Sequence, residues 1–398
     1  MKFGGTSVAT IDHIIKASEK VIEVSKQSKV IVVLSAMAGV TNSLVDQVKK
    51  ISDNDDPDSD LIFSTGEQVS SGLMSIYLNK KGINSRTWTG WQIPIITNSI
   101  FGKARIEKIS CKNIIDSFNK YDVAVVTGFQ GLTKDNRIST LGRGGSDTTA
   151  IAIAAAFNAS QCNIYTDVEG VYTANPLIVP KAKKIKRITY EEMLEMSSLG
   201  SKVLQTRSVE LAMKHKVVIQ VLSSQIDKPG TFVVSEELKM EKEFVSGISF
   251  SKDEAKITLS GLLDKPGVSA GIFGPLADSN INVDMIVQNI SQDGKRANIT
   301  FTLPQSELKK ATRVLEKIKK TKSFDSIKTD DKVAKVSAIG VGMRSQAGVA
   351  QKMFETLGKK NINIQAISTS EIKISVLIHE NSTELAVRSL HSAYGLDS

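Results

Sequence analysis

Residues 140–149, Thr-Leu-Gly-Arg-Gly-Gly-Ser-Asp-Thr-Thr, hold the densest group of residues that could do chemistry. Three glycines surround Arg143, and glycine lets the backbone take positive φ and approach a ligand closely. Because they add almost no side chain, we interpret them as serving a ligand rather than packing. Ser146 and Asp147 are favoured N-cap residues before an alanine-rich helix former. An anion site at a helix N-terminus is predicted, with a capped surface loop as the alternative.

Three other segments carry polar groups at the ends of predicted elements. Lys2 precedes Gly4 and Gly5 and a helix, which suits a phosphate. Thr65-Gly66-Glu67 begins a helix, and residues 165–172 supply hydroxyls and a carboxylate after a strand. Neither a P-loop nor a dinucleotide-binding glycine fingerprint occurs in the sequence.

Composition limits the class of protein. With 398 residues, 41% hydrophobic and 23% charged, the chain predicts a soluble globular protein of two to three domains. No run approaches the ~20 apolar residues of a membrane span, and the N-terminus has no apolar signal region. Two cysteines and four scattered histidines predict neither disulfides nor a metal site. We therefore expect a cytoplasmic protein without metal ligands of its own.

The net charge of +9 raises the question of nucleic acid. The densest basic run, residues 309–322, alternates with apolar residues at helical spacing. It therefore predicts the solvated face of an amphipathic helix. Aromatic residues make up 5% of the chain and do not interleave with this run as a stacking platform would. We expect neither a nucleic-acid nor a membrane partner.

Residues 1–230 alternate short apolar strands with amphipathic helices, which predicts an αβα sandwich around a largely parallel sheet. Ligands in such sheets bind beyond the carboxyl ends of the strands. Strands are expected at 29–34, 121–127, 163–168 and 217–222. Helices are expected at 8–26, 44–51, 66–81, 106–118, 147–157 and 202–214. The acidic segment 52–60 is expected to be a solvated loop.

An internal repeat follows a linker placed at 231–243. Residues 280–286 match 361–367 at an offset of 81, so one βαββαβ unit occurs twice. The second copy lacks room for its last strand, and 244–250 form an unassigned strand before the first copy. We predict that 244–255 complete the second copy (331–398), so that the first copy, 256–330, is inserted into it.

These segments closely resemble, in the same order, the signature motifs of the aspartokinases. The motifs are Lys2–Ser7, Thr65–Glu67, Gly142–Thr148, Tyr165–Val168 and Gly200–Leu204. The two repeats resemble that family's paired ACT regulatory domains. The resemblance implies an amino-acid-kinase fold followed by two ferredoxin-like domains, and ATP-dependent conversion of L-aspartate to 4-phospho-L-aspartate. That step opens the lysine, threonine, methionine and diaminopimelate pathway, with ATP and Mg²⁺, the latter bound mainly through the nucleotide.

The same resemblance assigns roles to single residues. Lys2, with Gly4 and Gly5, would neutralise the transferring phosphoryl group, and Asp147 would orient Lys2. No general base is required, since the nucleophile is an ionised carboxylate. Arg143 would clamp a substrate carboxylate in a bidentate manner. The other aspartate-binding residues would be Ser7, Thr41, Glu67 and Ser146. The other nucleotide-binding residues would be Thr166, Asp167, Tyr172 and Lys202.

Two departures from the family pattern stand out. Leu177 occupies a position where the family usually has a nucleotide-contacting arginine. We therefore expect weaker ATP binding, or a substitute cation from Lys181, Lys183 or Lys184. Only Met1 precedes Lys2, where relatives have a few more apolar residues. Lys2 is therefore expected to be poorly anchored, unless the true start lies upstream.

The resemblance also implies amino-acid effector pockets, for lysine and/or threonine, in the repeats. One would be lined by Asp264, Asn282, Asp284 and Gln288. A second would be lined by Ser345, Val349, Ala350, Asn363 and Ile364, with Ser370 and Glu371 nearby. Ordinary turn chemistry is the alternative for the asparagines, and Ala350 replaces a frequent threonine.

Pairing of ACT domains between chains implies a homodimer or larger oligomer. Two further interpretations stay open: a kinase for another small acid or nucleotide, such as glutamate or UMP, and a non-catalytic amino-acid sensor. The inhibiting amino acid, and whether Met240 starts a separate regulatory subunit, are not determined by the sequence.

Overall fold

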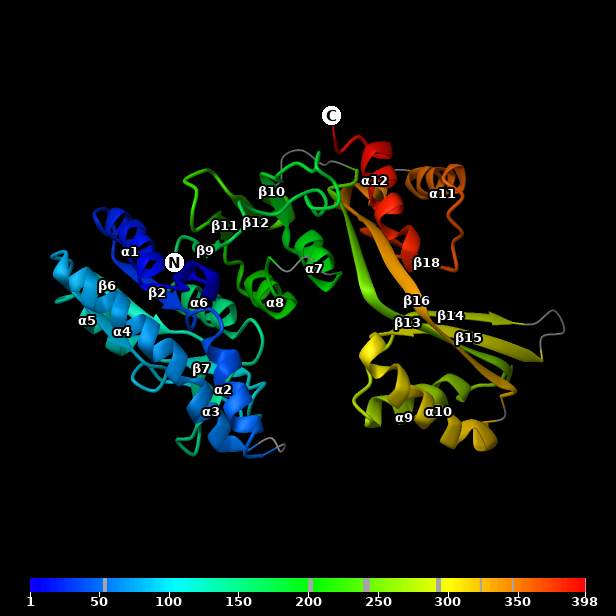
Figure 1. Cartoon of the computed structure of the whole chain (residues 1–398), viewed down its shortest axis with the longest axis horizontal. Helices are drawn as coiled ribbons and strands as arrows, with labels where there is room; N and C mark the ends of the chain where they lie inside the picture. Colours follow the sequence, from blue (N-terminus) through cyan, green and yellow to red (C-terminus); the bar gives the residue numbers. More distant parts are fainter. Residues whose placement is uncertain are drawn as a thin grey trace. The chain divides into compact units, whose positions relative to one another are not determined.

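The computed structural model describes residues 1–52, 56–199, 203–238, 244–290, 295–322, 324–345 and 347–397. They divide into two compact units (Figure 1). The first unit draws its residues from Met1–Val171, Lys184–Ser198 and Lys202–Glu241. The second draws them from Tyr172–Lys183, Leu199–Ser201 and Lys242–Ser398.

The first unit is built on an eight-stranded sheet in the order β10-β12-β11-β9-β1-β2-β6-β3. Every pair of neighbours is parallel except β11 and β12. The strands are β1 (Lys2–Phe3), β2 (Val30–Leu34), β3 (Ser85–Trp88), β6 (Val123–Thr127), β9 (Cys162–Thr166), β10 (Arg187–Thr189), β11 (Ile219–Ser223) and β12 (Thr231–Val234). β12 occupies residues that were expected to belong to the linker. The four strands expected from the sequence are present.

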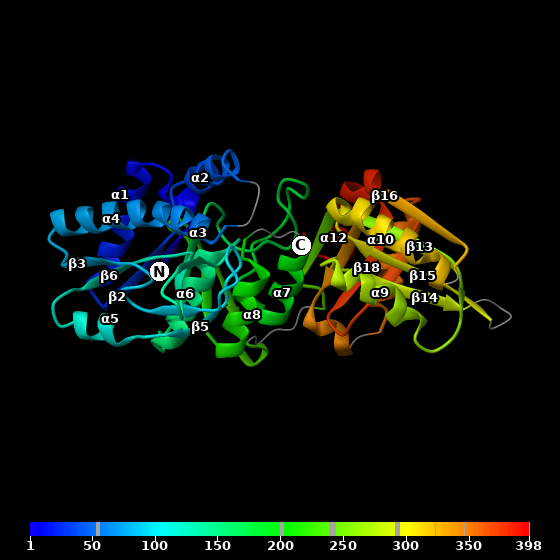
Figure 2. The same ribbon diagram turned by 90° about the horizontal axis from the view of Figure 1, so that it is seen from below.

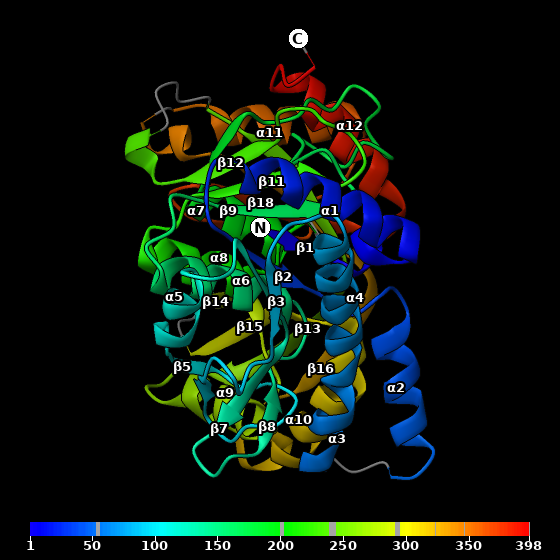
Figure 3. The same ribbon diagram turned by 90° about the vertical axis from the view of Figure 1, so that its left-hand side faces the viewer.

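Helices cover both faces of this sheet, as an αβα sandwich requires. Figures 2 and 3 show α1 and α4 on one face and α5, α6 and α8 on the other. The helices of the unit are α1 (Ile11–Ser25), α2 (Val40–Lys49), α3 (Pro57–Phe63), α4 (Thr65–Lys80), α5 (Lys112–Ser117), α6 (Gly145–Ala156), α7 (Tyr190–Ser198) and α8 (Thr206–His215). Residues 145–154 of α6 are all buried, so this helix is the centre of its layer.

Two sequence predictions in this unit were wrong. Residues 106–118 are not one helix: β5 (Ile106–Ile109) pairs with β4 (Ile95–Thr97) before α5 begins. The spacing of Ile106 and Ile109 suits a helix, but pairing with β4 overrides it. The acidic segment contains α3, whose first turn is capped by Asp56 and starts with a proline. β4 and β5 form a second sheet, β5-β4-β7-β8, with β7 (Gln130–Thr133) and β8 (Ile138–Thr140).

The second unit contains a six-stranded sheet in the order β14-β15-β13-β16-β18-β17. Its strands are β13 (Gly247–Leu263), β14 (Asp284–Ile290), β15 (Arg296–Leu303), β16 (Ser326–Ile339), β17 (Ala366–Thr369) and β18 (Lys373–His379). β13 and β16 are long and serve both repeats. The part of β13 at 247–251 pairs with 335–339, next to β18, and the part at 256–260 pairs with 326–330.

Each repeat is thus a ferredoxin-like βαββαβ unit, and the 247–251 part of β13 lies in the sheet of the second repeat. α9 (Val268–Asp278) and α10 (Leu308–Lys322) belong to the first repeat, α11 (Val349–Lys359) and α12 (Thr383–Ala393) to the second. Two apolar cores result, one around Phe301 and Leu315, the other around Val376 and Leu390. α10 carries the basic run and buries Ala311 and Leu315, as expected. In the part of the chain that is described, no helix is long and apolar enough to cross a membrane.

Candidate active site

β1 lies at the point where the order of the main sheet reverses. The chain extends the sheet through β2 and β6 on one side of β1 and through β9 and β11 on the other. Such a switch point opens a crevice at the carboxyl ends of the strands, and ligands bind there. Lys2, on β1, therefore lies between two potential binding positions, one on the β2 side of its strand and one on the β9 side.

Lys2 is firmly held, contrary to the expectation that it is poorly anchored. Its strand pairs with β2 on one side and β9 on the other, and the Met1 amino group donates to the Ile31 carbonyl oxygen (2.8 Å). The Lys2 ammonium lies 2.5 Å from Oδ1 of Asp147, and both residues are 8% exposed. The sequence-predicted pairing of these two groups is present.

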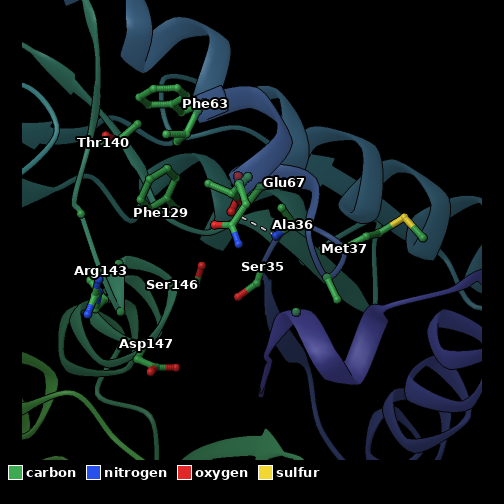
Figure 4. Close-up of a pocket in the computed structure, with 18 of the residues that line it drawn as sticks. Ser35, Ala36, Met37, Phe63, Glu67, Phe129, Thr140, Arg143, Ser146 and Asp147 are labelled. Carbon is green, nitrogen blue, oxygen red and sulfur yellow. Dashed lines mark hydrogen bonds between the residues drawn. The ribbon is translucent and has the colours of Figure 1, made fainter. Parts of the chain in front are cut away.

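A cavity of about 540 Å³ opens beside this pair (Figure 4). It brings together seven of the predicted site residues: Lys2, Gly5, Thr41, Glu67, Arg143, Ser146 and Asp147. Loop residues 35–39, after β2, and Phe63, Gly102, Phe129 and Thr140 complete much of the wall. Figure 4 shows the Ser146 hydroxyl directed into the cavity. A polar ligand with groups of both charges would find partners here.

Glu67 provides the buried acid of this cavity. Its Oε1 accepts a hydrogen bond from the Ala36 N–H (3.0 Å), and its Oε2 has no partner among the described residues. Burial raises the pKa of Glu67 to about 7, although the Ala36 N–H favours the ionised form. A cationic ligand group would supply the missing partner.

The loop before α6 differs in detail from the expectation. Gly142 and Gly144 have positive φ (75° and 69°), and Gly144 itself is the N-cap, so neither Ser146 nor Asp147 caps the helix. A Cβ on Gly142 would lie 2.8 Å from the Gly102 carbonyl oxygen, and one on Gly144 2.1 Å from Gln205 Cγ. The glycines therefore serve close packing as well as conformation, and the view that they exist only for a ligand was wrong.

Arg143, between these glycines, is exposed at the cavity rim. No hydrogen bond or ion pair joins its guanidinium to another residue in the described ranges. Ser7, expected beside it, does not line the cavity: it is buried, and its hydroxyl donates to the Tyr165 carbonyl oxygen (3.3 Å). Arg143 is thus free for an anion, whereas Ser7 is already engaged.

The expected nucleotide residues lie on the β9 side of β1. The register pairs Phe3 with Tyr165, so Gly4 and Thr166 leave adjacent strands together, and the Gly4 N–H donates to the Tyr165 carbonyl oxygen (3.2 Å). A side chain at Gly4 would come 3.4 Å from the Lys2 ammonium. Asp167 follows, within hydrogen-bond distance (3.0 Å) of the Thr166 hydroxyl. Glycine at position 4 therefore keeps the backbone close to the Lys2 ammonium, but its own N–H is already donated and is not free for a phosphate.

The other residues considered for nucleotide binding do not lie together in one unit of the described structure. Tyr172 belongs to the second unit, and Lys202 lies outside the described residues. Leu177 is 92% exposed. Of the three lysines considered as substitutes for an arginine at that position, Lys184 is in the first unit. Its ammonium donates to the Pro229 carbonyl oxygen (2.6 Å) and lies 3.6 Å from a Glu169 oxygen.

The predicted effector residues occupy both repeats of the second unit. Asp264, Asn282 and Asn363 are exposed, whereas Val349, Ala350 and Ile364 pack on the second repeat's core. Gln288 accepts from the Ser269 hydroxyl (3.4 Å). The Ser370 N–H donates to the Lys373 carbonyl oxygen (2.8 Å), Glu371 follows in the same turn, and Ser345 begins the approach to α11.

Asp284 has a partner that sequence reasoning missed. Its Oδ2 lies 2.7 Å from the ammonium of Lys335, which also lies 2.7 Å from Glu254. Burial lowers the pKa of Lys335, but the two carboxylates outweigh it and hold that pKa above its usual value. The alternation of charged residues along β13 and β16 gave no sign of which ones face inward.

Comparison with known proteins shows which family has this fold. The amino acid kinase family model matches residues 1–223, and an ACT domain model matches 257–318 and 336–394. The fold and the pocket therefore define a kinase domain of the amino acid kinase family followed by ACT domains. The chain is an enzyme of the kinase class.

Whole-chain relatives narrow the class. An aspartate kinase of Pseudomonas putida is 51% identical over 400 residues, which cover 100% of this chain and 97% of that protein. The structure of E. coli aspartokinase III in complex with aspartate and ADP matches with a TM-score of 0.81 and 26% identity, over 98% of both chains. The same protein in complex with lysine and aspartate gives a TM-score of 0.76. The chain belongs to the aspartokinase family.

Proposed function

We propose that the chain transfers the γ-phosphoryl group of ATP to the side-chain carboxylate of L-aspartate, giving 4-phospho-L-aspartate. The observation that carries this is the Lys2–Asp147 pair at the switch point of the sheet, between a glycine cradle and a cavity with a buried acid and a free arginine. The E. coli relative was solved with aspartate and ADP, which supports the same pair of ligands here.

Aspartate fits the charges of the cavity. Glu67 would bind its ammonium group through the unpartnered Oε2, and Arg143 would bind the α-carboxylate with two parallel hydrogen bonds. Thr41 and Ser146 would add hydrogen bonds. The β-carboxylate is then left facing Lys2. It is already ionised at neutral pH, so it attacks phosphorus without a general base.

The γ-phosphate would lie against Lys2 and the amide of Gly5, since the Gly4 N–H is already donated to the Tyr165 carbonyl oxygen. The rest of the nucleotide would lie toward Thr166, Asp167, Tyr172 and Lys202. Phosphoryl transfer needs mainly positioning and charge neutralisation, which a fixed ammonium and aimed N–H groups provide. Mg²⁺ would neutralise further phosphate charge. It would be held mainly through the nucleotide.

Regulation and assembly are parts of the same proposal. An amino acid, lysine or threonine, would bind the predicted ACT pockets and inhibit this first step of the lysine, threonine, methionine and diaminopimelate pathway. The E. coli relative's complex with lysine supports that ligand class.

Exposed Ile286, Ile290 and Ile367 lie on the edge strands β14 and β17, where a second copy could cover them. We propose a homodimer or larger oligomer of chains with a kinase domain at 1–230 extended by β12, and ACT domains at 256–330 and at 244–255 plus 331–398.

The test is the purified chain with ATP, Mg²⁺ and hydroxylamine, which traps an acyl phosphate as a hydroxamate. L-Aspartate should give hydroxamate, whereas L-glutamate and UMP should not be phosphorylated. The α-amide of aspartate, which lacks the carboxylate assigned to Arg143, should react poorly. Absence of aspartyl hydroxamate from folded protein would overturn the proposal and favour a sensor.

A further inference from the structure

Arg143 must be placed by its backbone, since no described residue holds its side chain. The chain leaves β8 at Thr140, turns at Gly142 and enters α6 at Gly145. What fixes Thr140 and the turn therefore fixes where the guanidinium starts. Two charged side chains outside the predicted site contact this backbone.

The first is Asp60 of α3, which is 2% exposed. Its carboxylate accepts from the Thr140 N–H (2.6 Å) and the Thr140 hydroxyl (2.8 Å), at the end of β8. It also accepts from the Gly102 N–H, at 2.9 and 3.1 Å to its two oxygens. Gly102 carries the carbonyl against which Gly142 packs. One carboxylate thus joins the base of the Arg143 loop to the segment beneath it.

The second is Arg207 of α8. Its two terminal nitrogens donate to the carbonyl oxygens of Leu141 (2.8 Å) and Ala104 (2.7 Å). Those residues directly follow Thr140 and the Gly102 turn, and the Ala104 N–H donates to the Thr140 carbonyl oxygen (2.9 Å). The planar guanidinium bridges the same two segments that Asp60 bridges.

We propose that Asp60 and Arg207 are positioning residues for the aspartate-binding arginine. They hold residues 140–142 and 102–104 together, and so set the acceptor side of the pocket without touching substrate. Thr140 and Gly102 both line the cavity, and Figure 4 shows Thr140 near Phe63, on the last turn of the helix that carries Asp60. This inference rests on the proposed role of Arg143. Lys2, Gly4 and Gly5 lie on β1 and the turn after it, which Asp60 and Arg207 do not contact. Changes at Asp60 or Arg207 should therefore leave ATP binding nearly unchanged.

The main test is Asp60→Asn in the full-length chain. The amide would place an N–H group against N–H donors of Gly102 or Thr140, which loosens the loop. We expect KM for aspartate to rise about tenfold or more, because a displacement near 1 Å can cost that much, with KM for ATP within threefold of the parent value. Asp58→Asn is the matched control: Asp58 lies on the same helix but pairs with Arg137 on the surface. It should leave both constants unchanged.

A double-mutant cycle separates positioning from general damage. In an Arg143→Ala background, Asp60→Asn should add less than twofold to KM for aspartate, because the group it positions is gone. Arg207→Lys, which can reach one carbonyl but not bridge both, should behave like Asp60→Asn to a smaller degree. If Asp60→Asn does not fold, Arg207→Lys and Thr140→Val, which removes one donor to Asp60, carry the test.

The inference fails if a folded variant keeps KM for aspartate within twofold. It also fails if KM for ATP rises equally, or if the effect persists undiminished without Arg143. Failure of the proposed function looks different, since the parent chain itself would then give no aspartyl hydroxamate.

Discussion

Each unit buries one lysine among its described residues, and the two have opposite surroundings. Lys2 has one carboxylate partner, Asp147, and lines a cavity. Lys335 has two carboxylate partners, Glu254 and Asp284, within a continuous sheet. The Lys2–Asp147 pair has no net charge, and its ammonium can still donate to a ligand anion in the cavity. The group of Lys335 and two carboxylates is net negative, so it would repel an anion and serves to hold its neighbours.

The comparison predicts the largest effect for Lys2→Met. Loss of the ammonium removes the fixed cation at the transferring phosphoryl group, so kcat should fall about 10³-fold or more, near 4 kcal/mol of transition-state stabilisation. Some stability should also be lost, because Asp147 is buried and loses its cation, but less than for Lys335→Met, since Asp147 lines the cavity. Steady-state kinetics and thermal unfolding measure the two quantities. A variant that loses stability but keeps kcat would reverse the roles assigned here.

Lys335→Met is the matched change in the second unit. It leaves Glu254 buried without its cation, and burial already raises the pKa of that carboxyl. We expect a loss of about 2–3 kcal/mol in unfolding free energy, less than for a group that cannot protonate. Activity without effector should stay within threefold. Glu254→Gln added to Lys335→Met should restore part of the stability; a further loss would contradict the ion-pair account.

The same contrast shows what the sequence could and could not predict. The Lys2–Asp147 pair was implied by the resemblance to the aspartokinases, which rests in part on the two glycine-rich motifs that contain these residues. Lys335, Glu254 and Asp60 stand in ordinary charged stretches, and their burial depends on tertiary pairing that local patterns do not record. The cap Asp56-Pro57, followed by Asp60 and Phe63 on one helical face, was the available signal that α3 and its buried acid exist.

Fold prediction succeeded and failed for similar reasons. Strand ends and the 81-residue repeat are local or periodic features, so the sandwich and the pair of ferredoxin-like repeats followed from them. The strand at 106–109 depends on its partner β4. The segment 172–183 packs with the second unit, where the Ile248 N–H donates to the Thr173 carbonyl oxygen (2.7 Å). Nothing in its own sequence specifies that partner.

Glu67 differs from the buried acids beside Lys2 and Lys335, because its proposed partner is the ammonium group of the substrate. Aspartate binding should therefore depend on pH. With a pKa of about 7, it is mostly neutral at pH 6 and ionised at pH 8. Since the ammonium of aspartate needs the carboxylate, KM for aspartate should fall about tenfold over that interval. Glu67→Gln should weaken binding at pH 8 and remove the slope. Calorimetry in two buffers should show proton release on binding to the parent chain near pH 7.

The raised pKa of Glu67 also makes the free energy of unfolding depend on pH. The folded pKa lies above the unfolded value of about 4.5, so the neutral side chain stabilises the fold fully below pH 4.5. That contribution, up to about 3 kcal/mol, is lost as pH rises through 7. Glu67→Gln should therefore unfold with a weaker pH dependence between 4.5 and 7. A parallel dependence in both proteins would show that Glu67 titrates normally.

The smallest effect is expected at Leu177, the position where the resemblance to the aspartokinases implies a nucleotide-contacting arginine. Leu177 is almost fully exposed, so Leu177→Arg should fold normally and can only add a phosphate contact. We expect KM for ATP to fall threefold to tenfold, about 1 kcal/mol, with KM for aspartate unchanged. Leu177→Gln controls for loss of the apolar side chain. Salt should weaken the gain in ATP binding, since an exposed ion pair is screened.

If KM for ATP is the same in the parent chain and Leu177→Arg, another cation already fills this role. Lys184 is then the first residue to replace, because it already lies beside Glu169 in the first unit.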